Sequence, residues 1–152
     1  MKATFDSNIL VYAADSESGD KHLMAADLLR RAGNGDCLLT LQALGEFFYV
    51  VTRKAKCDPA DAQGMVEVWR AVFPVFPADE GCLIAAMAAV GDHGLPFWDA
   101  MIWAAARRAG CRLLFTEDFQ DGRTLGGVTF VNPFEDRNAT LLGAALAPPR
   151  GG

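Results

Sequence analysis

Short apolar runs alternate with longer stretches of helical periodicity along most of this chain. The apolar runs predict five strands, at Lys2–Phe5, Cys37–Thr40, Val75–Phe76, Cys111–Phe115 and Val128–Val131. The periodic stretches predict a short helix around residues 9–12 and longer helices over residues 21–32, 41–55, 59–72, 79–90 and 97–109. Because neighbouring parallel strands need helical crossovers, this alternation predicts a three-layer α/β sandwich around a central, mainly parallel sheet.

The chain has the length of a single domain. Its 152 residues suffice for one hydrophobic core and leave no room for a second. We expect this domain to cover residues 1–135. The segment 136–152 ends in alanine, proline and glycine, and we expect it to be a partly disordered tail.

Composition and charge argue against several classes of protein. A net charge of -5 is atypical of a protein that holds nucleic acid by bulk electrostatics. The N-terminus has no secretory pattern, and the longest apolar run, Cys82–Val90, is too short to cross a bilayer, so we expect a cytoplasmic protein without membrane association. The 4 cysteines are widely spaced and there are only 2 histidines, which argues against zinc and histidine-rich metal sites.

Four acidic residues stand out from this background. Asp6 and Asp118 closely follow predicted strands, at the sheet edge where parallel α/β folds bind ligands. Glu46 shares a helical stripe with Gln42, and Asp99 lies on an otherwise apolar stripe, where a charge is costly unless paired or metal-bound. Each acid also has a simpler interpretation, as a helix cap, a turn residue, a first-turn acid or a solvated side chain, and the residues alone leave both interpretations open.

Convergence of these acids at one sheet edge would require a counter-charge, because carboxylates a few ångströms apart repel one another. Oxygen ligands without histidine or cysteine favour a hard divalent cation, Mg²⁺ or Mn²⁺. Such an ion would let a net-negative protein approach phosphate, and it would activate water for attack on phosphorus. The pattern therefore predicts metal-dependent hydrolysis of a phosphodiester.

The order of these segments also resembles a known family. The PIN-domain nucleases, and among them the VapC-like toxins of bacterial type II toxin–antitoxin systems, are similar to this chain in four segments: Asp6-Ser7-Asn8, Leu44–Phe48 around Glu46, Phe97–Ala100 around Asp99, and Thr116–Gly122. The resemblance extends over residues 1–134. It implies an endoribonuclease, dependent on Mg²⁺ or Mn²⁺, that cleaves structured RNA, forms a homodimer and is inhibited by a small cognate antitoxin.

The resemblance implies a role for individual residues. The catalytic, metal-binding acids would be Asp6, Glu46, Asp99 and Asp118. Asn8 and Thr116 would support them through hydrogen bonds. Asp121 lies in the same turn as Asp118 and is kept as a supporting or alternative ligand. Arg123 follows on the same edge and is a candidate for contacting phosphate.

Two alternatives remain at this point. A haloacid-dehalogenase-like phosphatase also uses an aspartate at a strand end, but it needs a second aspartate two residues later, where this chain has Asn8. A non-catalytic PIN-like binding scaffold would be expected to have lost part of the acidic set, whereas all four positions are acidic here.

Overall fold

Strand β1 (Ala3–Phe5) lies at the centre of the fold, where all of its residues are inaccessible to solvent. The fold is known from a computed structural model that describes residues 1–148. Phe5 stacks on Phe115, which occupies the matching position of the neighbouring strand, with ring centroids 5.1 Å apart. Burial on both faces explains why β1 has no solvent-facing side, and its one polar residue, Thr4, is as fully buried as Ala3 and Phe5.

The predicted mainly parallel sheet is confirmed. Four strands pair in the order β1-β4-β6-β5, with β4 at Leu113–Phe115, β6 at Val128–Val131 and β5 at Thr124–Leu125. The pairs β1/β4 and β4/β6 are parallel, and β5/β6 is antiparallel. A second parallel pair joins β2 (Leu39–Thr40) to β3 (Val75–Phe76). An isolated bridge between Ala3 and Cys37 links this pair to β1.

Two details of the sheet differ from the prediction. The strand expected over Cys37–Thr40 is regular only at Leu39–Thr40, because Cys37 forms a single bridge to β1 and the chain then shifts to β3. Strand β5 was not predicted. It forms a hairpin with β6 through Gly126 and Gly127, whose φ angles of 55° and 82° are those that a tight two-residue hairpin loop requires.

Seven helices surround the sheet in the described part of the chain. Their bounds are Ser7–Ala14 (α1), Asp20–Ala32 (α2), Leu41–Arg53 (α3), Pro59–Val72 (α4), Glu80–His93 (α5), Phe97–Arg108 (α6) and Ala139–Ala145 (α7), with short 3₁₀ turns at Ser16–Ser18 (η1) and Asp136–Asn138 (η2). Side-chain caps start several of these helices, and Thr40, Asp58 and Asp79 each accept a hydrogen bond from the first turn of α3, α4 and α5.

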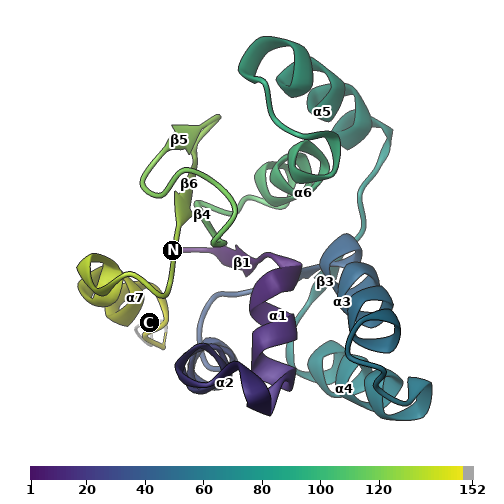
Figure 1. The fold of residues 1–152 in the computed structure, drawn as a ribbon. Coiled ribbons are helices and arrows are strands. Elements are labelled where there is room, and N and C mark those ends of the chain that lie inside the picture. The colour runs from purple at the N-terminus through teal and green to yellow at the C-terminus, as the bar shows by residue number, and fades with distance from the viewer. Residues whose placement is uncertain (149–152) are drawn as a thin grey trace.

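The helices form two layers with the sheet between them. Helices α5 and α6 pack on each other and lie on one side of β1, whereas α1 and α2 pack together on the other side (Figure 1). Helix α3 packs against α1 and α4. The three-layer arrangement therefore brings the starts of α1, α3 and α6 toward the carboxyl ends of β1 and β4.

The segment after residue 135 differs from the expected tail. Residues 136–145 form η2 and α7, and Leu142, Ala145 and Leu146 are buried against the core. Apolar residues at positions 142, 145 and 146 share one helical face, so burying that face favours a docked helix. Residues 149–152 of the expected tail lie outside the described residues.

The four cysteines are all free thiols. Cys37, Cys82 and Cys111 are buried free thiols, and Cys57 is a half-buried one. None of the helices in residues 1–148 is both long enough and apolar enough to cross a membrane.

Candidate active site

Asp6 and Thr116 lie directly after two neighbouring parallel strands. The Asp6 amide donates to the Phe115 carbonyl at 2.9 Å, which extends the β1/β4 ladder by one residue. The Thr116 hydroxyl then donates to Asp6 Oδ2 at 2.8 Å. Both side chains are almost completely buried, with 5% and 1% of their surface exposed. The sheet therefore places a carboxylate at its edge in a fixed orientation.

The burial of Asp6 makes its charge costly. Burial raises the pKa of Asp6 to about 6, and the hydrogen bonds from Thr116 and from the Ser7 amide only partly offset it. The nearby carboxylates of Asp118 and Glu46 contribute to this raised value. Asp6 also caps α1 by accepting from the Ser7 amide at 2.7 Å. The simpler interpretation of Asp6 as a helix cap is therefore correct, but it leaves the cost of burial unexplained.

Glu46 approaches this edge from α3. Its Oε2 accepts a 2.8 Å hydrogen bond from Ser7 Oγ, and its Oε1 accepts a 2.6 Å hydrogen bond from Gln42 Nε2, one helical turn earlier. Gln42 Nε2 also donates to the Trp98 carbonyl at 2.9 Å, in the first turn of α6. This bridge holds α3 and the start of α6 together.

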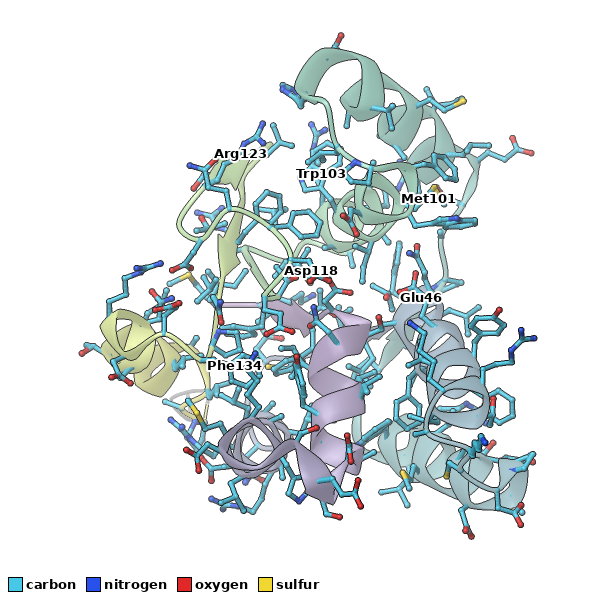
Figure 2. All side chains as sticks on the ribbon, in the orientation of Figure 1. Glu46, Met101, Trp103, Asp118, Arg123 and Phe134 are labelled. Atoms are coloured by element: carbon cyan, nitrogen blue, oxygen red, sulfur yellow. The ribbon has the colours of Figure 1, made fainter. Side chains whose placement is uncertain are left out.

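Asp118 lies in the turn after β4. Asn8 Nδ2, on α1, donates to Asp118 Oδ2 at 2.9 Å, and the Asp118 amide donates to Thr116 Oγ1 at 3.1 Å. Asn8 Oδ1 is buried and has no hydrogen-bond partner within the described part of the chain. In Figure 2, Glu46 on α3 and Asp118 after β4 lie near the same end of α1.

Asp99 completes the group from the first turn of α6. Burial raises the pKa of the Asp99 carboxyl, and the charges of Asp118 and Glu46 raise it further. These same two acids act on Asp6, so all four carboxylates belong to one electrostatically coupled group. Asp99 accepts no hydrogen bond from the described part of the chain, which leaves its oxygens free for a ligand.

The four acids have no cationic partner among residues 1–148. None of the ion pairs formed among residues 1–148 includes Asp6, Glu46, Asp99 or Asp118. Their partners are the neutral donors Ser7, Asn8, Gln42 and Thr116. Neutral donors orient carboxylates but leave their mutual repulsion in place.

The donor set fits a hard divalent cation. Within the described residues, no three acidic, histidine or cysteine side chains stand close enough to form a ready-made metal cage. Mg²⁺ does not need one, because it keeps several waters and binds proteins through one or two carboxylates. A buried carboxylate, a second one without hydrogen bonds and the unpartnered oxygen of Asn8 provide suitable oxygen ligands at this edge.

Asp121 has a different environment. Its carboxylate accepts hydrogen bonds from Arg137 Nη2 at 2.6 Å, from Asn138 Nδ2 at 3.0 Å and from the Asn132 amide at 2.8 Å. Burial alone would raise the pKa of Asp121, but these contacts lower it below its ordinary value. Asp121 therefore anchors the start of the C-terminal segment, whereas the Asp118 carboxylate contacts Asn8 on α1.

Arg123 is not adjacent to the carboxylates. It lies just before β5, where its backbone pairs with Phe130, and Figure 2 shows it well apart from both Glu46 and Asp118. The sequence placed it near the edge because it closely follows Asp121. The turn at 120–123 leads the chain away along β6.

Several contributors were not identified from the sequence. Ser7 follows Asp6 directly, and Gln42 precedes Glu46 by one helical turn, so their spacing was an available signal. A third contribution is a network around Glu117, which accepts a short hydrogen bond from the Tyr12 hydroxyl and pairs with Lys21 at 2.7 Å. This network links α1 and α2 to the turn that carries Asp118.

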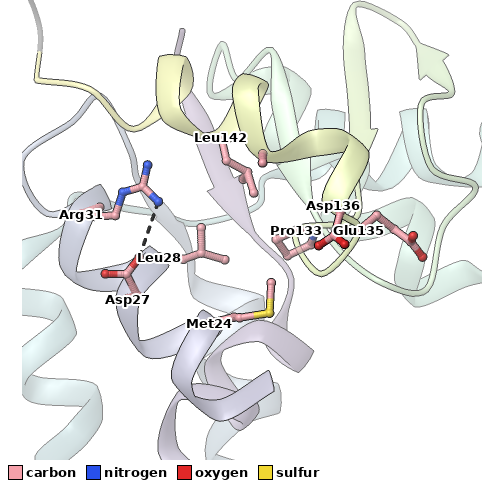
Figure 3. A pocket seen from close by; sticks show the side chains of 9 residues that line it. Met24, Asp27, Leu28, Arg31, Pro133, Glu135, Asp136 and Leu142 are labelled. Carbon is pink, nitrogen blue, oxygen red and sulfur yellow. Dashed lines mark hydrogen bonds and ion pairs between the residues drawn. The ribbon is translucent and has the colours of Figure 1, made fainter. Parts of the chain in front are cut away.

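Two hollows flank different parts of the structure. A cavity of about 610 Å³ adjoins the carboxylate group and is lined by Gln42, Gly45, Glu46, Tyr49, Val50 and Trp98. A smaller one, of about 190 Å³, lies between α2 and the C-terminal segment, where Asp27 pairs with Arg31 beside Leu28 and Leu142 (Figure 3). None of the four acids lines the smaller hollow.

Comparisons with known proteins agree with this fold. The chain matches the PIN domain family over residues 3–120. A chain of a toxin–antitoxin complex from Klebsiella pneumoniae is 22% identical, with a TM-score of 0.64 and coverage of 88% of this chain and 98% of that chain. VapC20 of Mycobacterium tuberculosis, a sarcin–ricin loop cleaving toxin, is 18% identical, with a TM-score of 0.63 and coverage of 76% and 89%.

A third solved structure, of VapBC2 from Rickettsia felis bound to a DNA fragment from its promoter, is 18% identical to this chain, with a TM-score of 0.63 and coverage of 87% and 98%. No curated protein matches the chain. At sequence identities of 18–22%, the similarity to these solved structures shows a shared fold. The match to the PIN domain family covers residues 3–120, which is most of the chain.

Proposed function

Because this chain belongs to the PIN domain family, we propose that it is a metal-dependent endoribonuclease that acts as the toxin of a toxin–antitoxin pair. The observation that carries the proposal is the coupled group of Asp6, Glu46, Asp99 and Asp118 at the carboxyl edge of the sheet, without a cationic partner in the described residues. Such a group is costly in a folded protein unless a cation binds to it.

In this proposal, Asp6, Glu46, Asp99 and Asp118 hold Mg²⁺ or Mn²⁺. A divalent cation bound there would supply Lewis acidity and neutralise the charge of a phosphodiester. Thr116, Asn8, Ser7 and Gln42 orient the carboxylates through the hydrogen bonds described above. Asp99, whose oxygens accept no hydrogen bond from residues 1–148, is the acid we assign to accept a proton from attacking water.

The direct test is cleavage of end-labelled RNA by the purified protein with Mg²⁺ or Mn²⁺. Cuts should be lost with EDTA and in Asp6→Asn, which removes a ligand charge with little change in volume. Asp92→Asn removes an equal charge from an exposed site on α5 and should cleave normally. A single-stranded DNA of the same sequence tests the preference for RNA. Metal-independent cleavage, or full activity of Asp6→Asn, would contradict the proposal.

A protein partner is part of the same proposal. Structures with this fold include toxin–antitoxin complexes from other organisms. Here, a groove of about 340 Å³ between α3 and α4 is lined mainly by apolar residues, among them Leu41, Leu44, Phe48 and Val66. We infer that a small cognate antitoxin covers this region and inhibits cleavage. Co-purification with the product of an adjacent gene, and relief of inhibition when that product is removed, would test it.

We also infer a homodimer, and the support comes from α5. Leu83, Ile84, Met87 and Val90 lie on its outer face and are 40%, 65%, 53% and 38% exposed. A contiguous apolar stripe of this kind marks an association surface. Light scattering should give a dimer for the wild type and a monomer for Ile84→Lys, and a monomeric wild type would contradict the inference.

A further inference from the structure

The cavity beside Glu46 contains aromatic side chains that the metal chemistry does not use. It lies between α3 and the first turn of α6, and its walls include Tyr49 and Trp98. Trp98 is 64% exposed and Tyr49 is 57% exposed, although both are large aromatic residues. Exposed aromatics beside a hydrolytic site are typical of stacking surfaces for nucleobases.

Trp98 is held in place at this position. Its carbonyl accepts a 2.9 Å hydrogen bond from Gln42, and its ring packs edge-to-face on Phe97 with centroids 4.9 Å apart. The residue that follows it is Asp99, a member of the carboxylate group. The backbone of Trp98 is therefore held next to the site, and its indole contacts Phe97 while most of its surface stays accessible for a base to stack on.

A cation lies beside Tyr49, and the side chain of Gln42 lines the same cavity. The Arg53 guanidinium lies 5.2 Å from the centroid of the Tyr49 ring, so a cation stands over this aromatic residue. Gln42 Oε1 is buried and has no hydrogen-bond partner among residues 1–148, because both contacts of this side chain use its Nε2. A buried acceptor without a donor is unfavourable in the unliganded protein.

Glu46 lies in both the cavity wall and the carboxylate group. A chain cleaved at the carboxylates must therefore place the nucleotide next to the scissile bond close to this cavity. We propose that the cavity between Tyr49 and Trp98 is a nucleobase subsite that binds one unstacked base of single-stranded RNA adjacent to the bond that is cut. This inference rests on the proposed ribonuclease function and defines the form of RNA that the site accepts.

The test combines changes in the protein with changes in the RNA. The substrates are single-stranded oligoribonucleotides that each carry one abasic sugar, and the position of this sugar is moved stepwise across the cleavage site from one substrate to the next. Cleavage of each substrate is measured with the wild type and with Trp98→Ala. In the wild type, one abasic position next to the cut should raise KM about tenfold, the loss expected for one base–aromatic stack. For intact RNA, the KM of Trp98→Ala should be about tenfold higher than that of the wild type. An abasic sugar should raise the KM of this variant only slightly more.

Further variants separate stacking from folding. Trp98→Phe retains an aromatic face and should keep most of the wild-type affinity, whereas Tyr49→Ala should resemble Trp98→Ala. Leu23→Ala is the control, because Leu23 is a 66% exposed apolar residue on α2 that does not line this cavity. If the abasic sugar raises KM by the same factor in the wild type and in Trp98→Ala, the proposed subsite is wrong.

Two more outcomes are decisive. If Trp98→Ala changes the oligomeric state at the assay concentration, a second copy of the chain covers the cavity and the proposal is wrong. If the wild type cleaves no RNA with either metal, the ribonuclease proposal fails, and base binding is then measured in Asp6→Asn with an oligoribonucleotide that contains 2-aminopurine. Quenching that Trp98→Ala abolishes would support the subsite, and no quenching would overturn it.

Discussion

The Thr116 hydroxyl donates a 2.8 Å hydrogen bond to Asp6 and thereby joins the carboxyl ends of β4 and β1. The same hydroxyl oxygen accepts from the Asp118 amide at 3.1 Å. One buried side chain thus orients two acids that come from segments more than 100 residues apart in the chain, since the Thr116–Asp6 separation is 110 positions. The position of Asp118 relative to Asp6 depends on this contact.

Thr116→Val should retain the packing of Thr116 and lose both hydrogen bonds. We expect cleavage activity to fall about 10- to 100-fold, the usual cost of losing a partner that orients a metal ligand. Thr116→Ser keeps the hydroxyl and should retain most of the activity. Measuring kcat and the Mn²⁺ concentration at half-maximal rate for both variants checks this, and equal activity of Thr116→Val and the wild type would contradict it.

The raised pKa of Asp6 predicts how stability depends on pH in metal-free protein. Below pH 3.8 the carboxyl is protonated in both the folded and the unfolded state, so it does not affect stability. As pH rises toward about 6, the unfolded state ionises first and the folded state loses stability. Above that range the full penalty, up to about 3 kcal/mol, is present.

Asp6→Asn removes this penalty. In EDTA, its Tm should exceed that of the wild type at pH 8, and the difference should shrink as pH falls to 4. Adding Mn²⁺ should raise the Tm of the wild type more than that of the variant, because binding to the folded state stabilises it. A Tm difference that is constant between pH 4 and pH 8 would be inconsistent with the burial of an ionised Asp6.

Asp118 and Asp121 should respond differently to the same substitution. Asp118→Asn should abolish cleavage and weaken Mn²⁺ binding while leaving Tm almost unchanged. Asp121→Asn removes the charge that Arg137 and Asn138 contact, so it should lower stability by about 1–3 kcal/mol and leave Mn²⁺ affinity within about twofold. Calorimetric titration with Mn²⁺ and thermal denaturation of both variants separate the roles, and the reverse pattern would make Asp121 the ligand.

Glu117 should act by positioning the turn that carries Asp118. Glu117→Ala removes the contacts to Tyr12 and Lys21, and we expect the Mn²⁺ requirement to rise about tenfold. The ion pair itself adds little stability, because the Lys21 side chain is 45% exposed. Glu117→Gln keeps an acceptor for Tyr12 and should be milder. A loss of Tm without any change in Mn²⁺ requirement would indicate a purely structural role.

The sequence by itself determined the layered α/β architecture and the sheet edge where the acids lie. Period and length of the apolar runs distinguish strands from helices, and the carboxyl ends of parallel strands must meet at one edge. Asp6 and Thr116 could therefore be located at that edge from their positions alone, and the i, i+4 spacing of Gln42 and Glu46 was also visible.

Only the tertiary structure decided which acids share an environment. Asp118 and Asp121 are three residues apart and alike in chemistry, yet Asp121 is bound by residues 11 to 17 positions later in the chain, and Asp118 by Asn8, 110 positions earlier. The same holds for β5 and for the docked helix α7, which exist because they pair with or pack on distant segments. The periodicity of the sequence predicts whether a residue lies on the buried or the exposed face of its own helix or strand. It does not predict which distant residue a carboxylate will contact, because that depends on how the elements pack together.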